Sequence, residues 1–357
     1  MKKLNLAIIG QGRSGKDIHG KFYISADNTL FNVKYVVDAD EYRRGVSLER
    51  YPGCQVLCNY KELLEKKDID LVVNATYSDM HYTITKELLE NGFNVLVEKP
   101  FARSQYECDD LIRIAKEKGL VLAVFQQTFF APFYQDMLRV IDSGVLGDIL
   151  QLTIRYNVFA RRWDWQTLQK RVGGNAYNTG PHPIGVALGV LGFDENTELV
   201  FSKMAHSEMS SGDYDDYCKM LLTAPGKPLV DIEINNTDGY SGNCFILQGT
   251  KGCFKCSTTS YEYKYIVDGE NPERPVQENF MQNADGNPVY CGEKLIVHEE
   301  KGDYHGTAFD VGTKMLYEDV YKAITEGKEL YVTAEHARKI IAVIETAHAQ
   351  NHLPRKY

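Results

Sequence analysis

Two short segments of the chain carry side chains that could move a proton. Glu98-Lys99-Pro100 closes a strand-like run, and more than seventy residues later Gly173-Gly174 is followed by Asn178-x-Gly180-x-His182. Imidazole titrates near neutral pH, and burial can lower the pKa of a lysine towards the same range. Lys99 and His182 are therefore candidates for acid–base chemistry at a reacting oxygen, and either of them could be the base.

A glycine pattern near the amino terminus makes this chemistry more specific. Leu4 to Ile9 is an apolar run that ends in Gly10-x-Gly12-x-x-Gly15, and a helix is expected from Ser14 towards Tyr23. In that context the three glycines permit a tight turn, close approach of the backbone to a pyrophosphate, and close packing of helix on strand. The loop predicted to bind a dinucleotide comprises Gly10, Gln11, Gly12, Arg13, Ser14 and Gly15.

Asp38 bears on which dinucleotide is bound. It lies 23 residues beyond Gly15, at the end of a second strand, Val33 to Val37. A carboxylate there accepts hydrogen bonds from the adenosine ribose and repels a 2′-phosphate, so NAD is favoured over NADP. Arg43-Arg44, expected in the following loop, is the opposing signal because it could neutralise that phosphate. NADP therefore stays as the alternative.

Strands and helices must alternate to position these residues. Buried strands are expected at 70–75, 93–97 and 120–125, with helices at about 79–90 and from Ser104 to Gly119. Apolar strands separated by helices require right-handed crossovers in a parallel sheet. We predict an α/β Rossmann domain over residues 1–125.

The pattern changes in the rest of the chain. A helix is expected from Pro132 to Ser143-Gly144, and from Asp148 apolar and polar residues alternate with the period of a strand. Further strand-like runs lie near 198–205, 217–223, 229–234, 244–249 and 262–267. We predict a second, α+β domain over residues 126–357, with a mainly antiparallel open sheet and helices on one face. A last helix, about 334–349, is capped by Thr333 and could pack back on the Rossmann domain.

Composition excludes several classes of function. The net charge is −9 and basic residues are scattered, which disfavours nucleic acid as a partner. The longest apolar stretch, Ile184 to Phe193, is about half of the ~20 residues that span a membrane. We expect a cytoplasmic protein whose eight cysteines are reduced. Cys253-x-x-Cys256 has no second pair, and the other histidines show no ligand spacing, so no metal is predicted.

The motifs together resemble one family, the glucose-fructose oxidoreductase, inositol dehydrogenase and MocA (Gfo/Idh/MocA) group. The similarity covers almost the whole chain. Besides the glycine loop it rests on Ala75-Thr76-Tyr77-Ser78-Asp79-Met80-His81, Glu98-Lys99-Pro100, Gly173-Gly174 with Gly180-x-His182, Ser143-Gly144-x-Leu146-Gly147-Asp148 and Val332-Thr333-Ala334-Glu335.

The resemblance implies hydride transfer between NAD(P) and a carbon that bears a hydroxyl, with sugars and cyclitols as the usual substrates. Lys99 would hydrogen-bond the reacting oxygen, His182 would be the acid/base, and the Lys99-Pro100 bond could be cis. A homodimer or homotetramer is expected. The further cofactor-binding residues would be Thr76, Tyr77, Ser78, His81, Glu98, Lys99 and Gln127, with His81 supporting the loop rather than performing chemistry.

The chain departs from the family pattern around the substrate. Asn178 stands where many members have an aspartate, and an amide can orient a histidine but cannot take a proton. Gln126-Gln127 stands where the family often has Asn-Arg. Arg162 and Trp163 lie just before the Gly-Gly turn and could cover the substrate, although packing or a subunit contact is an equal alternative.

Three functions are consistent with these residues. The first is an NAD(P)-dependent dehydrogenase or reductase of a sugar, cyclitol or related polyol. The second keeps the same site but uses transient oxidation to cleave a glycoside by elimination, with no net NADH. The third is a nucleotide-binding sensor without catalysis, for which Asn178 is the main support.

Overall fold

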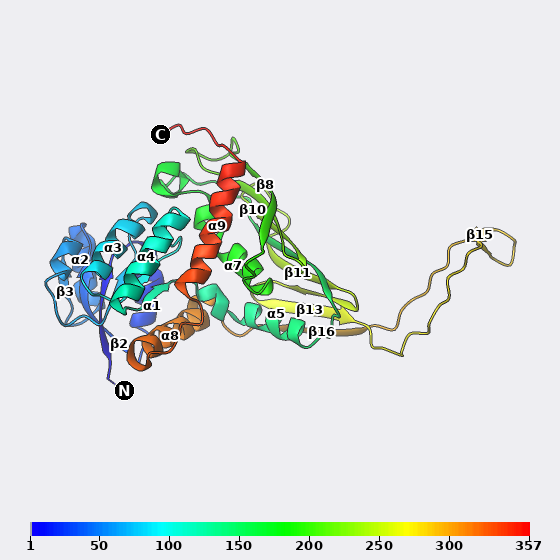
Figure 1. The fold of residues 1–357 in the computed structure, drawn as a ribbon, viewed down its shortest axis with the longest axis horizontal. Helices are drawn as coiled ribbons and strands as arrows, with labels where there is room; N and C mark the ends of the chain where they lie inside the picture. The colour runs from blue at the N-terminus through cyan, green and yellow to red at the C-terminus, as the bar shows by residue number, and fades with distance from the viewer. Residues whose placement is uncertain (1) are drawn as a thin grey trace.

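Six parallel strands form the first sheet in the computed structural model, which describes residues 2–357 (Figure 1). The strand order is β3-β2-β1-β4-β5-β6. The chain adds strands outward in one direction from β1 and in the other direction from β4. At such a switch point, open α/β sheets form a crevice that binds nucleotides. The bounds are β1 Leu4–Ile9, β2 Phe31–Val37, β3 Gln55–Leu57, β4 Leu71–Asn74, β5 Val95–Val97 and β6 Leu122–Val124.

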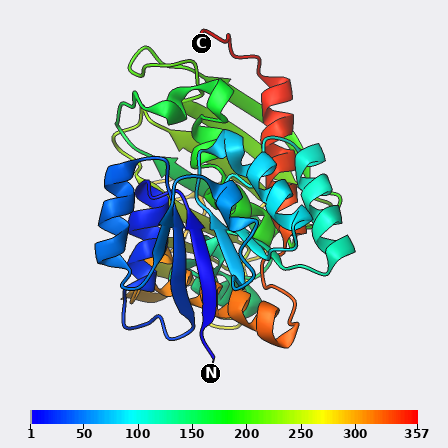
Figure 2. The same ribbon diagram turned by 90° about the vertical axis from the view of Figure 1, so that its left-hand side faces the viewer.

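Helices cover this sheet, as the doubly wound prediction requires (Figure 2). They are a π-helix over Ser14–His19 that continues into α1, then α2, α3 and α4: α1 Gly20–Tyr23, α2 Glu41–Arg50, α3 His81–Glu90 and α4 Gln105–Lys118. The loop predicted around Arg43 and Arg44 is wrong, because both residues lie in α2. The Asp40 carboxylate accepts from the Arg43 N–H and so begins that helix.

Eight strands form the second sheet, in the order β16-β13-β12-β11-β7-β10-β9-β8. Only β7 and β10 are parallel neighbours, so the sheet is mainly antiparallel as predicted. Its strands are β7 Ile149–Asn157, β8 Glu198–Ala205, β9 Tyr217–Thr223, β10 Leu229–Asn235, β11 Asn243–Gly249, β12 Gly252–Cys256, β13 Ser260–Tyr265 and β16 His298–Asp303.

One face of the second sheet is covered by helices that separate it from the first domain (Figure 1). These are α5 Pro132–Asp142, α6 Asn175–Asn178, α7 Pro181–Val190 and α9 Ala334–Gln350. Helix α7 is apolar on nearly all sides because it is enclosed between the sheet, α9 and the short turn Gln127–Phe130 that follows β6. Helix α9 contacts both domains: Arg338 pairs with Asp109 of α4 at 2.9 Å, and Gln350 accepts from Ser202 of β8.

Helix α8, Thr313–Glu326, belongs in space with the first sheet. The ring of Tyr317 stacks on Phe22 with centroids 4.8 Å apart and meets Phe31 edge-on at 5.4 Å. The Tyr321 hydroxyl donates to the carbonyl of Lys2. The chain therefore returns to the amino-terminal domain after residue 125. The domain boundary near residue 125 stays a prediction.

A long arm projects from the second sheet between β13 and β16 (Figure 1). It spans about residues 268–297 and carries at its tip the short pair β14, Met281–Gln282, and β15, Pro288–Val289. Large apolar side chains on it are bare: Val276 is 88%, Phe280 71% and Tyr290 103% exposed. No pattern in the sequence predicted this arm.

The structure also bears on the expectations about a membrane span and a metal site. Residues 2–357 include no helix long and apolar enough to cross a membrane and no cluster of three or more side chains suited to a metal. Cys253 and Cys256 both lie in β12, where a spacing of three places them on opposite faces, one exposed and one buried.

Candidate active site

The glycine loop follows β1 and is shaped by close backbone contacts. Gly10 has φ +93°, and a Cβ there would collide with the carbonyl of Ala75. A Cβ on Gly15 would strike the carbonyl of Gly10, whereas one on Gly12 would meet nothing within 4 Å. Gly10 and Gly15 therefore serve the turn itself, and Gly12 leaves an open space beside the loop, where a pyrophosphate needs backbone access.

Asp38 holds the glycine loop from the end of β2. Its carboxylate accepts the backbone N–H of Gln11 at 2.7 Å and that of Asp40 at 2.9 Å. Arg44 donates to the carbonyl of Asp38 at 2.8 Å, and the half-exposed Arg43 guanidinium lies 3.7 Å from the carboxylate. One face of the predicted ribose site is thus acidic, with Arg43 close by.

The loop after β4 is held by buried hydrogen bonds. The Thr76 hydroxyl donates to Asn74 at 2.7 Å, and Ser78 is buried beside it. His81 is buried and its Nδ1 lies 2.7 Å from the carbonyl of Pro100. Burial lowers the pKa of His81, so this imidazole is a neutral support for the loop.

Lys99 connects the two domains. Its peptide bond to Pro100 is cis, as the resemblance implies. Its Nζ donates to the backbone carbonyl of Asn178, 2.7 Å away, at the end of α6. Burial lowers the pKa of Lys99, the charge of Glu98 opposes that effect, and the nearby positive charges of Arg13 and Arg162 reinforce it.

His182 lies in the first turn of α7. Its Nδ1 is 2.7 Å from the hydroxyl of Thr128, which follows β6. Burial lowers the pKa of His182 to about 3; the charge of Lys99 acts in the same direction and that of Glu98 opposes it. The imidazole is therefore neutral near pH 7.

The side chain of Asn178 points into a second hydrogen-bond chain. Its Oδ1 accepts from Gln166 Nε2 at 2.7 Å, and the Oε1 of Gln166 accepts from Arg162. Arg162 also pairs with Asp164 at 2.7 Å. Arg162 is thus joined to the predicted site through Asn178. Trp163 is 72% exposed, and the guanidinium of Arg161 lies over its ring, 5.6 Å from the centroid.

Several residues of this region were missed by sequence reasoning. Thr128 and Gln166 fix His182 and Asn178, but single hydroxyl and amide side chains give no recognisable spacing. Trp165 packs edge-on against Tyr77 with centroids 4.9 Å apart, and Arg171 pairs with Asp79 at 2.8 Å. Through these contacts the segment before the Gly-Gly turn closes against the loop after β4.

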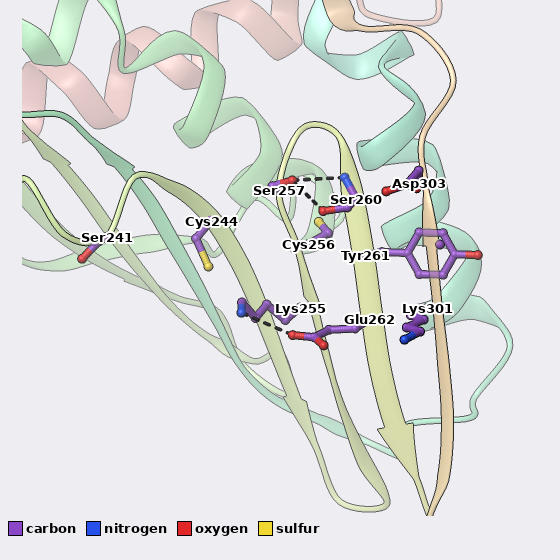
Figure 3. A pocket seen from close by; sticks show the side chains of 11 residues that line it. Ser241, Cys244, Lys255, Cys256, Ser257, Ser260, Tyr261, Glu262, Lys301 and Asp303 are labelled. Atoms are coloured by element: carbon purple, nitrogen blue, oxygen red, sulfur yellow. Dashed lines mark hydrogen bonds and ion pairs between the residues drawn. The ribbon is translucent and has the colours of Figure 1, made fainter.

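Gln127 is buried, and its side-chain oxygen has no hydrogen-bond partner among the described residues; the same holds for Gln126. Buried acceptors normally have partners, so these two oxygens are open to a donor group of a ligand. A separate hollow of about 530 Å³ lies over β12, β13 and β16 and is lined by charged residues such as Lys255, Glu262 and Lys301 (Figure 3). It shares no residue with the predicted site.

Comparison with protein families matches nearly the whole chain. Residues 4–126 match the Gfo/Idh/MocA oxidoreductase family model for the NAD-binding Rossmann fold, and residues 139–352 match the model for its carboxyl-terminal alpha/beta domain.

Curated and solved relatives are similar along most of their length. The scyllo-inositol 2-dehydrogenase (NADP(+)) IolW of Bacillus subtilis is 25% identical over 96% of this chain and 92% of its own. The 2,7-anhydro-N-acetylneuraminate hydratase of Mediterraneibacter gnavus is 23% identical over 83% of this chain and 78% of its own. Among solved structures, GenD2 from gentamicin A biosynthesis in complex with NAD has a TM-score of 0.77 at 20% identity, covering 100% of this chain and 97% of GenD2.

Proposed function

Because this chain belongs to the Gfo/Idh/MocA family of NAD(P) oxidoreductases, we propose that it transfers hydride between a nicotinamide and a carbinol carbon of a sugar, cyclitol or related polyol. The observation that carries the proposal is that Lys99 and His182 are both held by hydrogen bonds where the two domains meet. Lys99 of the first domain bonds to Asn178, and His182, four residues later, bonds to Thr128.

The residues present fit a bound dinucleotide. Gly12 leaves room beside the backbone, Asp38 offers a carboxylate at the end of β2, and Gln127 has a free buried acceptor. Gly10, Gln11, Gly12, Arg13, Ser14 and Gly15 would hold the pyrophosphate, while Thr76, Tyr77, Ser78, Glu98 and Gln127 would surround the nicotinamide half. When bound, the cofactor supplies or accepts the hydride.

In this proposal Lys99 and His182 divide the work on the substrate hydroxyl. Lys99, as a cation, stabilises the developing negative charge on oxygen. His182, neutral near pH 7, takes the hydroxyl proton during oxidation and returns it during reduction. The Thr128 hydroxyl holds the imidazole, and Asn178 orients both groups without supplying a charge.

We propose NAD as the preferred cofactor. The Asp38 carboxylate is fixed by two backbone N–H groups, so it cannot swing away from an incoming phosphate. Arg44 is engaged by carbonyl oxygens, which leaves only Arg43 to favour NADP. The solved relative KijD10, a 3-ketoreductase at TM-score 0.76 and 18% identity over 98% of both chains, was crystallised with NADP, so both cofactors occur on this fold.

A second candidate is a reaction with no net redox change. One relative is named a hydratase, an activity that consumes no hydride overall. The same site could oxidise a substrate, allow an elimination or hydration beside the new carbonyl, and then return the hydride. A glycoside cleaved in this way would leave NAD⁺ unchanged.

Self-association is also proposed. The outer face of the second sheet carries a half-buried network of Arg155, Lys219, Asp231 and Glu233 that no element of the described chain covers. The arm leaves the same sheet with bare aromatic side chains, which single soluble chains seldom expose. We propose a second copy of this chain as the partner, in a homodimer or homotetramer. Such a copy would cover both the charged outer face of the sheet and the apolar side chains of the arm.

The proposal is tested by mixing the purified protein anaerobically with NAD⁺, or separately NADP⁺, and a panel of sugars, sugar acids, inositols and simple glycosides. Growth of NADH absorbance with an oxidised product would support the dehydrogenase. A cleaved or hydrated product without NADH would support the second candidate. Tight NADH binding with neither product would favour a sensor and contradict both enzymatic functions.

A further inference from the structure

A row of four buried polar side chains leads from Lys99 into the interior of the first domain. Glu98 is 5% exposed, His19 and Tyr317 are fully buried, and Tyr23 is 6% exposed. His19 Nε2 lies 3.1 Å from Glu98 Oε1, and His19 Nδ1 lies 2.7 Å from the Tyr317 hydroxyl. Tyr23 donates to the hydroxyl of Tyr317. Three separate segments therefore meet: the π-helix with its continuation α1, the end of β5, and helix α8.

The acceptor groups in this row determine which atom donates in each hydrogen bond. An ionised carboxylate only accepts, so Nε2 of His19 carries the hydrogen that bonds to Glu98. In the tautomer with its hydrogen on Nε2, Nδ1 of His19 accepts from Tyr317, which in turn accepts from Tyr23. In this arrangement each of the three hydrogens has an acceptor. Burial raises the pKa of both tyrosines well above the usual value, so both keep their protons at working pH.

The row ends on a carboxylate that serves the cofactor loop. Glu98 also accepts from the Ser14 hydroxyl in the glycine loop and, at 3.0 Å, from the backbone N–H of Lys99. Burial acts to raise the pKa of Glu98, but the hydrogen bond from His19, the positive charge of Lys99 and the hydrogen bond from the Ser14 hydroxyl outweigh it and lower the pKa to about 2. The charged or titratable groups that face Glu98 are His19, Lys99, His81, His182 and Tyr317.

Packing alone does not require these polar groups. The Tyr317 ring lies among Phe22, Phe31 and Phe125, and a phenylalanine would fill the same space. A hydroxyl or imidazole buried in such a cluster costs free energy unless it is hydrogen-bonded. The polar atoms are satisfied only through one another, and the end of their chain is Glu98.

We infer that His19 and Tyr317 are positioning residues that hold Glu98 as an anion, so that it anchors Ser14 of the glycine loop and stands as the counter-charge of Lys99. Helix α8, from the carboxyl-terminal part of the chain, thereby contributes to the cofactor site without touching it. The charge state of Glu98 is a property of the protein alone, whereas its benefit to catalysis rests on the proposed function.

The test is a pair of substitutions at His19 that differ in where they place a side-chain N–H. His19→Gln keeps an amide N–H near the position of Nε2, whereas the amide of His19→Asn is one methylene shorter and does not reach Glu98. Carbon-13 NMR of protein labelled at glutamate Cδ, assigned with Glu98→Gln, would follow the Glu98 carboxyl through a pH titration. A hydrogen bond to a charged group corresponds to roughly one to two pKa units. We expect His19→Asn to raise the pKa of Glu98 by that amount, and His19→Gln to leave it near the wild-type value.

Two further variants keep the test decisive if His19→Asn does not fold. Tyr317→Phe should raise the pKa of Glu98 in the same direction by a smaller amount. Tyr321→Phe removes a hydroxyl one turn along the same helix that bonds to Lys2 instead, so it should cause no shift. Unchanged titration of Glu98 in both His19→Asn and Tyr317→Phe, or an equal shift in Tyr321→Phe, would overturn the inference.

Fluorescence titration with NADH provides a second readout that needs no substrate. Loss of the Glu98–Ser14 anchor should weaken NADH binding roughly tenfold in His19→Asn and much less in His19→Gln. If the NMR shift appears but NADH binds to none of the proteins, the inference about Glu98 stands and the proposed function fails. If NADH binds equally to both variants and the pKa of Glu98 is also unchanged, the inference fails and the function is untouched.

Discussion

The ammonium group of Lys99 donates to the backbone carbonyl of Asn178 and not to its side chain. The side-chain oxygen of Asn178 is bound instead by Gln166. A change of side chain at position 178 can therefore alter the charge near His182 without removing the bond that holds Lys99.

Asn178→Asp should change the pH dependence of activity. A carboxylate at this position favours the imidazolium form, so the pKa of His182 rises from its present value of about 3. If neutral His182 is the base, the acidic limb of the rate of alcohol oxidation moves to higher pH. A full pH–rate profile of both proteins would show this, and superimposable profiles would mean that position 178 is not coupled to the base.

Thr128→Val should slow turnover without much effect on substrate binding. The valine has a similar shape but removes the hydroxyl that holds His182 Nδ1. We expect kcat to fall roughly fivefold at a nearly constant KM, since one hydrogen bond of about 1 kcal/mol is lost. Thr128→Ser restores the hydroxyl and should recover most of the rate. A drop of equal size in the serine variant would point to packing instead.

Asp38→Ser should reduce the preference for NAD. The carboxylate is expected to hold the adenosine ribose and to repel a 2′-phosphate, so its loss should shift the ratio of NAD to NADP affinity by roughly ten- to a hundredfold. Arg43→Ala, next to the same site, should shift the ratio the opposite way. Wild-type protein that binds NADPH tenfold more tightly than NADH would refute the role given to Asp38.

Asp215 provides a prediction about stability. Its Oδ2 accepts the Ala176 N–H at 2.8 Å, its Oδ1 has no partner among the described residues, and burial raises its pKa to about 8. Between the ordinary pKa of 3.8 and about 8 the folded protein holds a proton that the unfolded chain releases, so stability falls as pH rises through that range. Asp215→Asn removes this dependence, and its Tm advantage should be larger at pH 8 than at pH 5. An advantage that does not vary with pH would contradict the assignment.

Removal of the arm tests self-association. A variant in which residues 270–296 are replaced by a short turn should have a lower mass by light scattering than the full chain at equal concentration, because the bare side chains of Phe280 and Tyr290 are lost. Circular dichroism serves as the control for folding. A full chain that is already monomeric would remove the proposal of a homo-oligomer.

The family and the two-sheet fold could be predicted because their signals are local. Glycine spacing, apolar strands and helix caps each depend on neighbouring residues, and apolar strands that alternate with helices predict a doubly wound parallel sheet. The positions of Arg43 and Arg44 were misjudged because the Asp40 cap was overlooked. The helix expected from Ser104 begins with a local cap: the Ser104 hydroxyl accepts from the backbone N–H of Glu107, and the Glu107 carboxylate accepts from the N–H of Arg103.

Contacts between distant segments were not predictable from the sequence. His19 and Tyr317 are almost three hundred residues apart, and nothing in either neighbourhood indicates the other. The same is true of Thr128 with His182 and of Gln166 with Asn178, which form only after the domains pack together. The arm could not be predicted because its polar sequence, which contains glycine and proline, is typical of an ordinary loop.

The measurement that tests the central claim most directly is the rate of hydride transfer, followed by NADH absorbance, for wild-type protein and Lys99→Met on a substrate found in the polyol panel. Removal of the cationic group should lower the rate by roughly a hundredfold or more while NADH still binds, because in the proposed function the lysine stabilises charge on the reacting oxygen. His182→Ala should behave similarly. Wild-type and Lys99→Met proteins that reduce NAD⁺ at the same rate would contradict the account.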